Sequence, residues 1–309
     1  MLADAAWVWI PVVLLAALTQ TVRNTAQRSL AADTGPVGAA LARFLYGLPF
    51  AGLAIVALNL AGAASGLPTF SATYFLWLGL GAAVHAGGSA LFIAAMRRGS
   101  FVVAVTYSKT EVVQVAVFAA LLLAELPTAL TLVGMVLALT GVTLLYRGEG
   151  AAPGSAQARD VLATAVLGIA TGGCYAMAAV GYRAAGLELE RLGQSPVVVA
   201  AWSVCLAQLG QSAAMGAYLA LREPQALRAV VRSWRLSFTA GSAGAVASLC
   251  WFLAYVLRPA TDVRIVGMAE VVFSYFVSHR LLRERTPWRE RLAILMVVAG
   301  AVCASLGTR

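Results

Sequence analysis

Three charged residues stand inside long apolar stretches, where charge is expensive. Lys109 and Glu111 are close together in one stretch, and Glu270 lies in another. A charged side chain in hydrocarbon costs at least ~2.5–3.5 kcal/mol, so each needs a partner or a task. Burial favours the neutral form of a carboxylate, which lets it take up and release a proton. We therefore expect Glu111 and Glu270 to handle protons or cations, with Glu111 the preferred proton carrier. A purely structural ion-pair network is the alternative.

Lys109 is the only lysine of the chain and belongs to its richest polar segment. On one unbroken helix, the polar neighbours of Lys109 share a single arc. They are Thr106, Tyr107, Thr110, Glu111 and Gln114. Because Lys109 lies beyond the edge of this arc, Lys109 and Glu111 should each meet a partner on another helix. We expect the arc to line a water-filled cavity, in which Tyr107, Lys109, Thr110 and Gln114 contact a solute.

The first apolar stretch carries amides at helical spacing, Gln20, Asn24 and Gln27, with Arg23 beside them. Amides donate and accept hydrogen bonds, so Gln20 and Asn24 are expected to bind a polar solute. Hydrogen bonding between helices is an equally good interpretation. Arg23, and Arg43 in the next stretch, are the expected partners of the two glutamates.

His85 and Trp251 complete the set of candidate site residues. Histidine titrates near neutral pH, so His85 is a candidate for ion or proton coupling, although its glycine neighbours favour a packing role. Trp251 belongs to a group of aromatic residues that could wall a cavity and stack on a solute, with ordinary packing as the alternative. The group also contains Tyr107, Tyr175, Tyr182, Trp202 and Tyr255.

The composition places all of these residues in a membrane protein. Of 309 residues, 61% are hydrophobic and 11% are charged, and the mean hydropathy is +0.84. A soluble domain of this length would need more charge on its surface. The net charge of +9 comes from arginines in short connections, which does not indicate nucleic-acid binding. The four scattered cysteines indicate neither disulfides nor a metal, and no catalytic or nucleotide-binding motif is present, so we expect no enzyme and no cofactor.

Apolar runs between turn and charge signals predict an all-α polytopic membrane protein with ten transmembrane helices. The first run lacks the features of a cleaved signal peptide and is taken as the first helix. The predicted spans are 7–31, 36–60, 71–97, 100–123, 128–146, 161–187, 196–221, 236–257, 261–282 and 288–306.

The two halves of the chain match one another. When Glu111 is placed on Glu270, Glu125 falls on Glu284, and other matches follow at the same offset. They are Gly141 with Gly300, Ser89 with Ser248, Ala42 with Ala201, and His85 with Gly244. We therefore expect two five-helix repeats, 1–146 and 161–309, joined by a linker over 147–160. An odd number of helices makes the repeats inverted, an architecture found in alternating-access transporters.

The end of each repeat resembles the EamA branch of the drug/metabolite transporter superfamily. The resemblance lies in AELPTALTLVGMVLALTGVTLL, within 111–146, and in RERTPWRERLAILMVVAGAVCASL, within 270–306. Each segment has a short Glu-containing turn followed by a final helix with a late glycine. One departure is Thr106–Glu111, which replaces the Asn-Tyr-Leu-Trp-Pro-like stretch typical of aromatic amino-acid exporters.

The resemblance implies a secondary active transporter, more specifically an exporter of amino acid-like metabolites or cationic drugs by alternating access. A nucleotide-sugar or phosphosugar exchanger is the first alternative, and a non-transporting membrane scaffold or sensor is the second. The expected partners are a small-molecule solute and membrane lipid, without nucleic acid. We expect a monomer or homodimer in a bacterial inner membrane.

The distribution of arginines predicts an orientation. Connections after odd-numbered spans hold most of the arginines, whereas those after even-numbered spans hold mainly Arg183, Arg191, Arg258 and Arg264. The positive-inside rule then places both termini outside. The family resemblance implies cytoplasmic termini, so the two arguments disagree.

Overall fold

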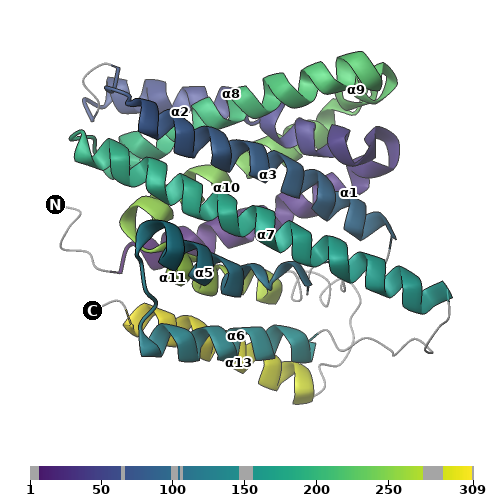
Figure 1. The fold of residues 1–309 in the computed structure, drawn as a ribbon. Coiled ribbons are helices and arrows are strands. Elements are labelled where there is room, and N and C mark those ends of the chain that lie inside the picture. Colours follow the sequence, from purple (N-terminus) through teal and green to yellow (C-terminus); the bar gives the residue numbers. More distant parts are fainter. Residues whose placement is uncertain are drawn as a thin grey trace.

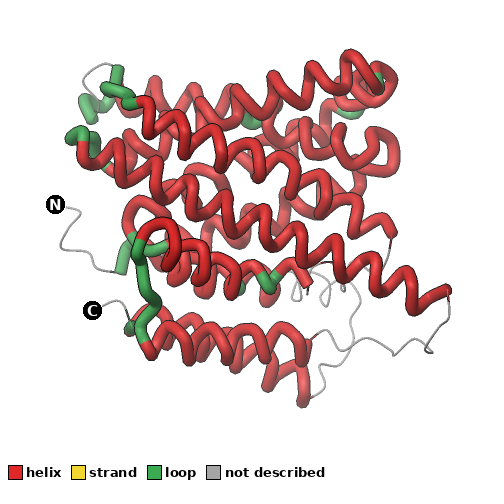
Figure 2. The backbone as a smooth tube through the Cα atoms, in the orientation of Figure 1, coloured by secondary structure: helices red, strands yellow, loops and turns green. Residues whose placement is uncertain are grey.

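The fold is all-α. The computed structural model describes residues 7–63, 67–98, 104, 107–145, 156–273 and 288–307, and the regular structure in these ranges is helical throughout (Figures 1 and 2). The helices are α1 (Trp9–Leu45), α2 (Leu48–Leu60), α3 (Ala72–Arg98), α5 (Glu111–Leu123), α6 (Ala129–Leu145), α7 (Ala156–Arg191), α8 (Pro196–Arg222), α9 (Pro224–Arg232), α10 (Trp234–Leu257), α11 (Ala260–Gly267) and α13 (Trp288–Leu306).

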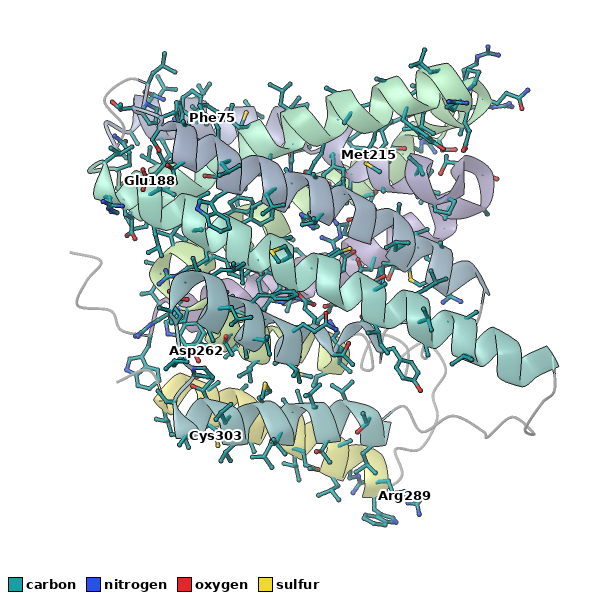
Figure 3. All side chains as sticks on the ribbon, viewed as in Figure 1. Phe75, Glu188, Met215, Asp262, Arg289 and Cys303 are labelled. Carbon is teal, nitrogen blue, oxygen red and sulfur yellow. The ribbon has the colours of Figure 1, made fainter. Side chains whose placement is uncertain are left out.

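The described helices suit a membrane in length and composition. Five helical segments are long and apolar enough to cross one, and three shorter apolar helices accompany them. The predicted count of ten spans stays a prediction. Large apolar side chains cover the outside, such as Phe75 of α3 (Figure 3) and Leu121 of α5, whereas Glu111 and Arg43 are only 2% exposed. Apolar outer faces, with the charged groups withdrawn into the interior, are what a lipid environment requires.

A kink inside α1 separates the first two predicted spans. Gly35 has a φ of 68° and a ψ of 175°, and Pro36 follows it. Positive φ suits glycine, and proline has no N–H to continue the hydrogen-bond ladder. The predicted boundary at this place is correct, but it is a sharp bend and not an open loop. The second predicted span is itself divided by a turn at Tyr46 and Gly47, before α2 begins.

The packing of the helices follows the internal repeat. Extensive contacts join α1 to α10, α3 to α7, and α6 to α13. In the sequence match, α1 corresponds to α7 and α3 corresponds to α10. The α1–α10 and α7–α3 pairs are therefore equivalent, and α6 pairs with its own counterpart, α13, below α5 and α11 (Figure 1).

Glycines allow the end helices of the two repeats to touch. A Cβ added to Gly134 would lie 2.6 Å from the carbonyl oxygen of Gly300, and one added to Gly141 would lie 2.6 Å from that of Ala293. The later residue of α6 thus meets the earlier residue of α13, so these two helices run antiparallel. This direction agrees with repeats of opposite orientation.

Candidate functional site

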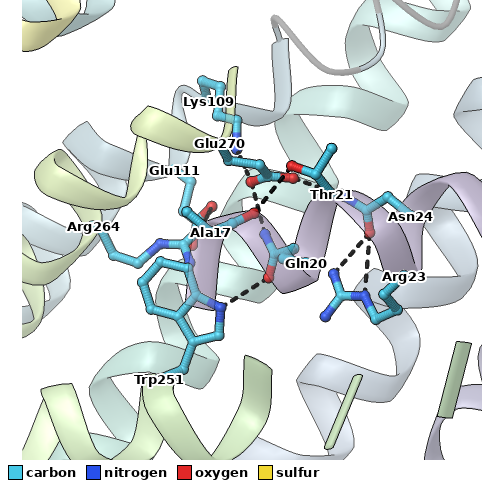
Figure 4. A network of polar contacts seen from close by, with 10 residues as sticks. All are labelled: Ala17, Gln20, Thr21, Arg23, Asn24, Lys109, Glu111, Trp251, Arg264 and Glu270. Atoms are coloured by element: carbon cyan, nitrogen blue, oxygen red, sulfur yellow. Dashed lines mark hydrogen bonds and ion pairs between the residues drawn. The ribbon is translucent and has the colours of Figure 1, made fainter. Parts of the chain in front are cut away.

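Glu270 is the centre of a buried hydrogen-bond cluster (Figure 4). Its Oε2 accepts hydrogen bonds from Lys109 Nζ and from Gln20 Nε2, both at 2.7 Å. Its Oε1 accepts one from Asn24 Nδ2, also at 2.7 Å. Gln20 and Asn24 are one turn apart on α1, so both amides reach the same carboxylate. The structure thus brings together four of the predicted site residues.

Glu111 has a different cationic partner. It forms an ion pair with Arg264 of α11, whose guanidinium lies 4.7 Å from the centre of the Trp251 ring. Trp251 Nε1 donates to Gln20 Oε1 at 2.9 Å, which links this pair to the Glu270 cluster (Figure 4). The prediction that Lys109 and Glu111 meet separate partners is confirmed.

The predicted pairing of Arg23 or Arg43 with the glutamates is wrong. Both carboxylates already have cationic partners. Arg23 donates instead to Asn24 Oδ1, at 2.8 and 3.2 Å. Arg43 contacts His85 Nε2 at 3.1 Å and Ser89 Oγ at 3.4 Å.

Sequence reasoning missed Arg264 as a partner of Glu111, because it was counted among the connection arginines although the predicted span 261–282 contains it. The structure starts α11 at Ala260, with Pro259 at the N-cap and Asp262 in the first turn. An acidic residue in the first turn is a helix-start signal, and it agrees with the predicted span 261–282, in which Arg264 lies. Arg183 was also counted as a connection residue and is buried in α7. Arg264 and Arg183 therefore lie inside helices and drop out of the count of connection arginines that predicts the orientation.

The contacts of His85 define its protonation state. A guanidinium only donates, so His85 Nε2 must accept from Arg43. His85 Nδ1 then carries the proton and donates to Tyr182 Oη at 2.9 Å. His85 is therefore neutral in this conformation and holds Arg43 in place. Its proposed part in ion or proton coupling stays a prediction.

The Glu111–Arg264 pair borders a small central cavity of about 40 Å³, and Gln20 on the same cavity wall joins it to Glu270. This volume is far below the roughly 300–1,000 Å³ of pockets for drug-sized ligands, so solute binding requires the helices to move apart. Of the predicted site residues, the cavity wall contains Gln20, His85, Glu111 and Trp251. The rest of the wall is Arg23, Arg43, Tyr175, Ala178, Ala179, Tyr182, Ser248, Phe252, Tyr255 and Arg264.

The other predicted residues of the polar arc pack against α7. A Cβ added to Gly168 would lie 2.7 Å from Tyr107 Cβ, and one added to Gly173 would lie 2.9 Å from Gln114 Oε1. The side-chain oxygen of Thr110 packs against Gly172 of α7 in the same way. A turn at 109–110 interrupts the helix before α5, so the arc calculated for an unbroken helix does not apply. Solute contacts by Tyr107, Thr110 and Gln114 stay a prediction.

Some predicted features fall outside the part of the chain that the structure describes. They are Thr106, Glu284 and the end of the predicted span 261–282. Over the described ranges, no three His, Cys, Asp or Glu side chains are grouped so that they could hold a metal ion.

Comparison with known proteins identifies both repeats. The profile of the EamA-like transporter family matches residues 7–147 and again 162–306. No curated protein matches the sequence. One solved structure, described as "Crystal structure of protein", superposes on this chain with a TM-score of 0.67 at 17% sequence identity. The match covers 99% of this chain and 97% of the other, so the two share a fold.

Proposed function

Because the chain belongs to the EamA-like transporter family, we propose that it is a secondary active transporter that exports a small organic solute by alternating access. An amino acid-like metabolite fits this site best, and a bacterial inner membrane is the proposed location. The family is one of transporters, which suggests a small solute as the substrate. The observation that carries the proposal is a buried polar cavity to which both repeats contribute.

Both ion pairs, the one that lines the cavity and the one linked to it through Gln20, cross between the repeats. Lys109 and Glu111 come from the first repeat, whereas Glu270 and Arg264 come from the second. A relative movement of the two halves would therefore change both pairs at once. Solute and coupling-ion sites at the interface of inverted repeats are the arrangement that alternating access uses.

Arg183 of α7 supports the proposal because it joins the two repeats next to residues of the cavity wall. It follows Tyr182, which lines the cavity. Its guanidinium donates to Glu125 Oε1 of the first repeat at 2.9 Å. It also donates to the backbone carbonyls of Tyr255 and Val256 at the end of α10, both at 2.7 Å. One side chain thus joins three segments in a layer beside the cavity.

A second contact between the repeats lies in the same region. Thr131 Oγ1 of α6 donates to Asp262 Oδ1 of α11 at 3.0 Å, and Asp262 is labelled in Figure 3. Glu125 and Asp262 line a common pocket of about 230 Å³. We call Arg183, Glu125, Asp262 and Thr131 the gate cluster, and we propose that it separates when the cavity opens to this side.

Replacing Arg183 with methionine should open the cavity on the gate-cluster side. The variant loses hydrogen bonds to a carboxylate and to two carbonyls, each worth ~1–3 kcal/mol. The reporter is a thiol at position 248, introduced as Ser248→Cys in a protein without the four native cysteines. We expect this thiol to react about 10-fold faster with a membrane-impermeant reagent in the Arg183→Met variant than in the protein that keeps Arg183. Arg191→Met on the same helix is the control, since its side chain is 81% exposed. Equal labelling rates in all proteins would refute the gate.

The transport proposal itself is tested in two steps. Detergent-purified protein is screened for a rise in Tm with amino acids, quaternary amines, sugar phosphates and nucleotide sugars. Each stabilising compound is then tested for counterflow, in which liposomes preloaded with unlabelled compound take up the labelled one. We expect counterflow for at least one compound, and none in empty liposomes. Ligand-induced stabilisation without counterflow would favour a sensor, and the absence of both would favour a scaffold.

A further inference from the structure

The cavity carries more positive charge than its carboxylates can neutralise. Lys109 is paired with Glu270, and Arg264 with Glu111. Arg23 and Arg43 are 5% and 2% exposed, and neither forms a salt bridge with a carboxylate of the described chain. Among the described residues, three arginines and one carboxylate line the cavity, and the adjoining Lys109–Glu270 pair brings one charge of each sign, so two guanidinium groups are left without a carboxylate partner.

Neutral groups hold the two extra arginines in position. Arg23 is bound by the side-chain oxygen of Asn24. Arg43 is bound by His85 and Ser89, and its guanidinium lies 4.5 Å from the centre of the Phe44 ring. These partners orient the guanidinium groups but do not neutralise them. A buried charge without a counter-charge is costly, so its presence calls for a reason.

Arg23 and Arg43 converge on one wall of the cavity. Both line it, and both lie against Gly244 of α10. A Cβ at Gly244 would come within 3.2 Å of Arg23 Cδ and 3.6 Å of Arg43 Cβ. Gly244 thus leaves space for the two side chains, and both arginines line the same cavity. Paired guanidinium groups suit a carboxylate or a phosphate.

Glu111 offers a complementary group on the cavity wall. Its Oε2 is bound by Arg264, but its Oε1 is buried and has no hydrogen-bond partner among the described residues. A carboxylate oxygen only accepts, so this atom is suited to a hydroxyl or an ammonium group. The cavity therefore combines an acid-binding pair of arginines with a site for a hydrogen-bond donor.

We infer that the transported solute is a small organic acid, whose carboxylate or phosphate binds Arg23 and Arg43 and whose hydroxyl or amino group donates to Glu111 Oε1. The inference rests on the proposed function, since it names the solute class of the same cavity. Excess positive charge works against a cationic drug, because such a solute would add an unpaired charge of the same sign.

The test compares probes that differ by one group. Malate carries carboxylates and a hydroxyl, succinate lacks the hydroxyl, and malamide lacks the charge. Glycerol 3-phosphate and glycerol form the phosphate pair, and tetraethylammonium is the cation. The Kd of each is measured by thermal shift. We expect malate or glycerol 3-phosphate to bind at least ~10-fold more tightly than its uncharged counterpart. The preferred acid distinguishes the carboxylate from the phosphate, and malate should bind more tightly than succinate.

Variants locate the acid-binding site. Arg43→Gln and Arg23→Gln should each weaken acid binding by about 10-fold or more, the effect of one lost charged hydrogen bond. Arg43→Lys keeps the charge and should lose less, and it serves as the second variant if Arg43→Gln does not fold. Arg191→Gln, at an exposed site, should bind as the unmodified protein does.

Three results would overturn the inference: malamide or tetraethylammonium binding as tightly as the acids, no binding of any acid, or unchanged acid binding in both arginine variants. Failure of the transport proposal gives a different result. Counterflow of a neutral or cationic compound would support transport and contradict the acid site. Acid binding that depends on the arginines, without counterflow, would support the site and contradict transport.

Discussion

Replacing Lys109 with methionine is expected to lower the free energy of unfolding by about 3–5 kcal/mol, the cost of leaving a buried charge without its partner. Glu270 is 5% exposed, and Lys109 is its ion-pair partner at 2.7 Å. The amides of Gln20 and Asn24 would still bind the carboxylate, but they carry no charge. Denaturant or thermal unfolding of the protein in detergent measures the change.

Two further variants identify the cause of this loss. The double variant Lys109→Met/Glu270→Gln removes both charges, so it should recover most of the lost stability. Arg191→Met breaks an exposed pair with Glu188, and such pairs contribute about 0–1 kcal/mol. If the single and the double variant are equally unstable, the loss comes from packing at Lys109 and not from the unpaired charge of Glu270.

Much of the fold follows from sequence periodicity and the internal match. Apolar runs predicted the helical class and a boundary between residues 31 and 36, where the structure has the bend at Gly35. The matched glycines Gly141 and Gly300 are both contact points between the end helices. The turn at 109–110 could not be found in this way, because Lys109 and Thr110 are not helix breakers. At residues 109–110 the chain forms contacts with α7 and with Glu270, and the regular helix is interrupted there.

The candidate site was predicted in its composition but not in its pairing. Gln20, Asn24, Lys109 and Glu270 were each selected because polar groups inside a membrane need partners, and they meet in one cluster. Which cation meets which carboxylate depends on the rotation and depth of every helix, and one sequence does not specify these. The glutamates were consequently assigned to Arg23 and Arg43. In the structure these two arginines line the cavity wall without a carboxylate partner among the described residues.

The structure gives the two glutamates unequal suitability as proton carriers. Glu270 accepts hydrogen bonds on both oxygens, from Lys109, Gln20 and Asn24, and all of these stabilise its charged form. Glu111 has one oxygen bound by Arg264 and one without a partner among the described residues, and it lines the cavity. A proton could reach Glu111 through the cavity, and separation from Arg264 would favour its protonated form. This difference supports Glu111 as the proton carrier that the sequence favoured.

Replacing Glu111 with glutamine should therefore abolish solute accumulation driven by a pH gradient, because glutamine keeps the shape of the side chain but cannot exchange a proton. Counterflow should persist at a lower rate, because the solute loses its contact with the charged carboxylate but the exchange itself needs no proton. Both activities are measured in the same liposomes, with a labelled compound that the unmodified protein exchanges. Glu111→Gln also leaves Arg264 unpaired, so Glu111→Gln/Arg264→Met serves to separate instability from coupling. If the folded Glu111→Gln protein still accumulates solute in response to a pH gradient, Glu111 is not the proton carrier. Glu270→Gln is then the next variant to measure.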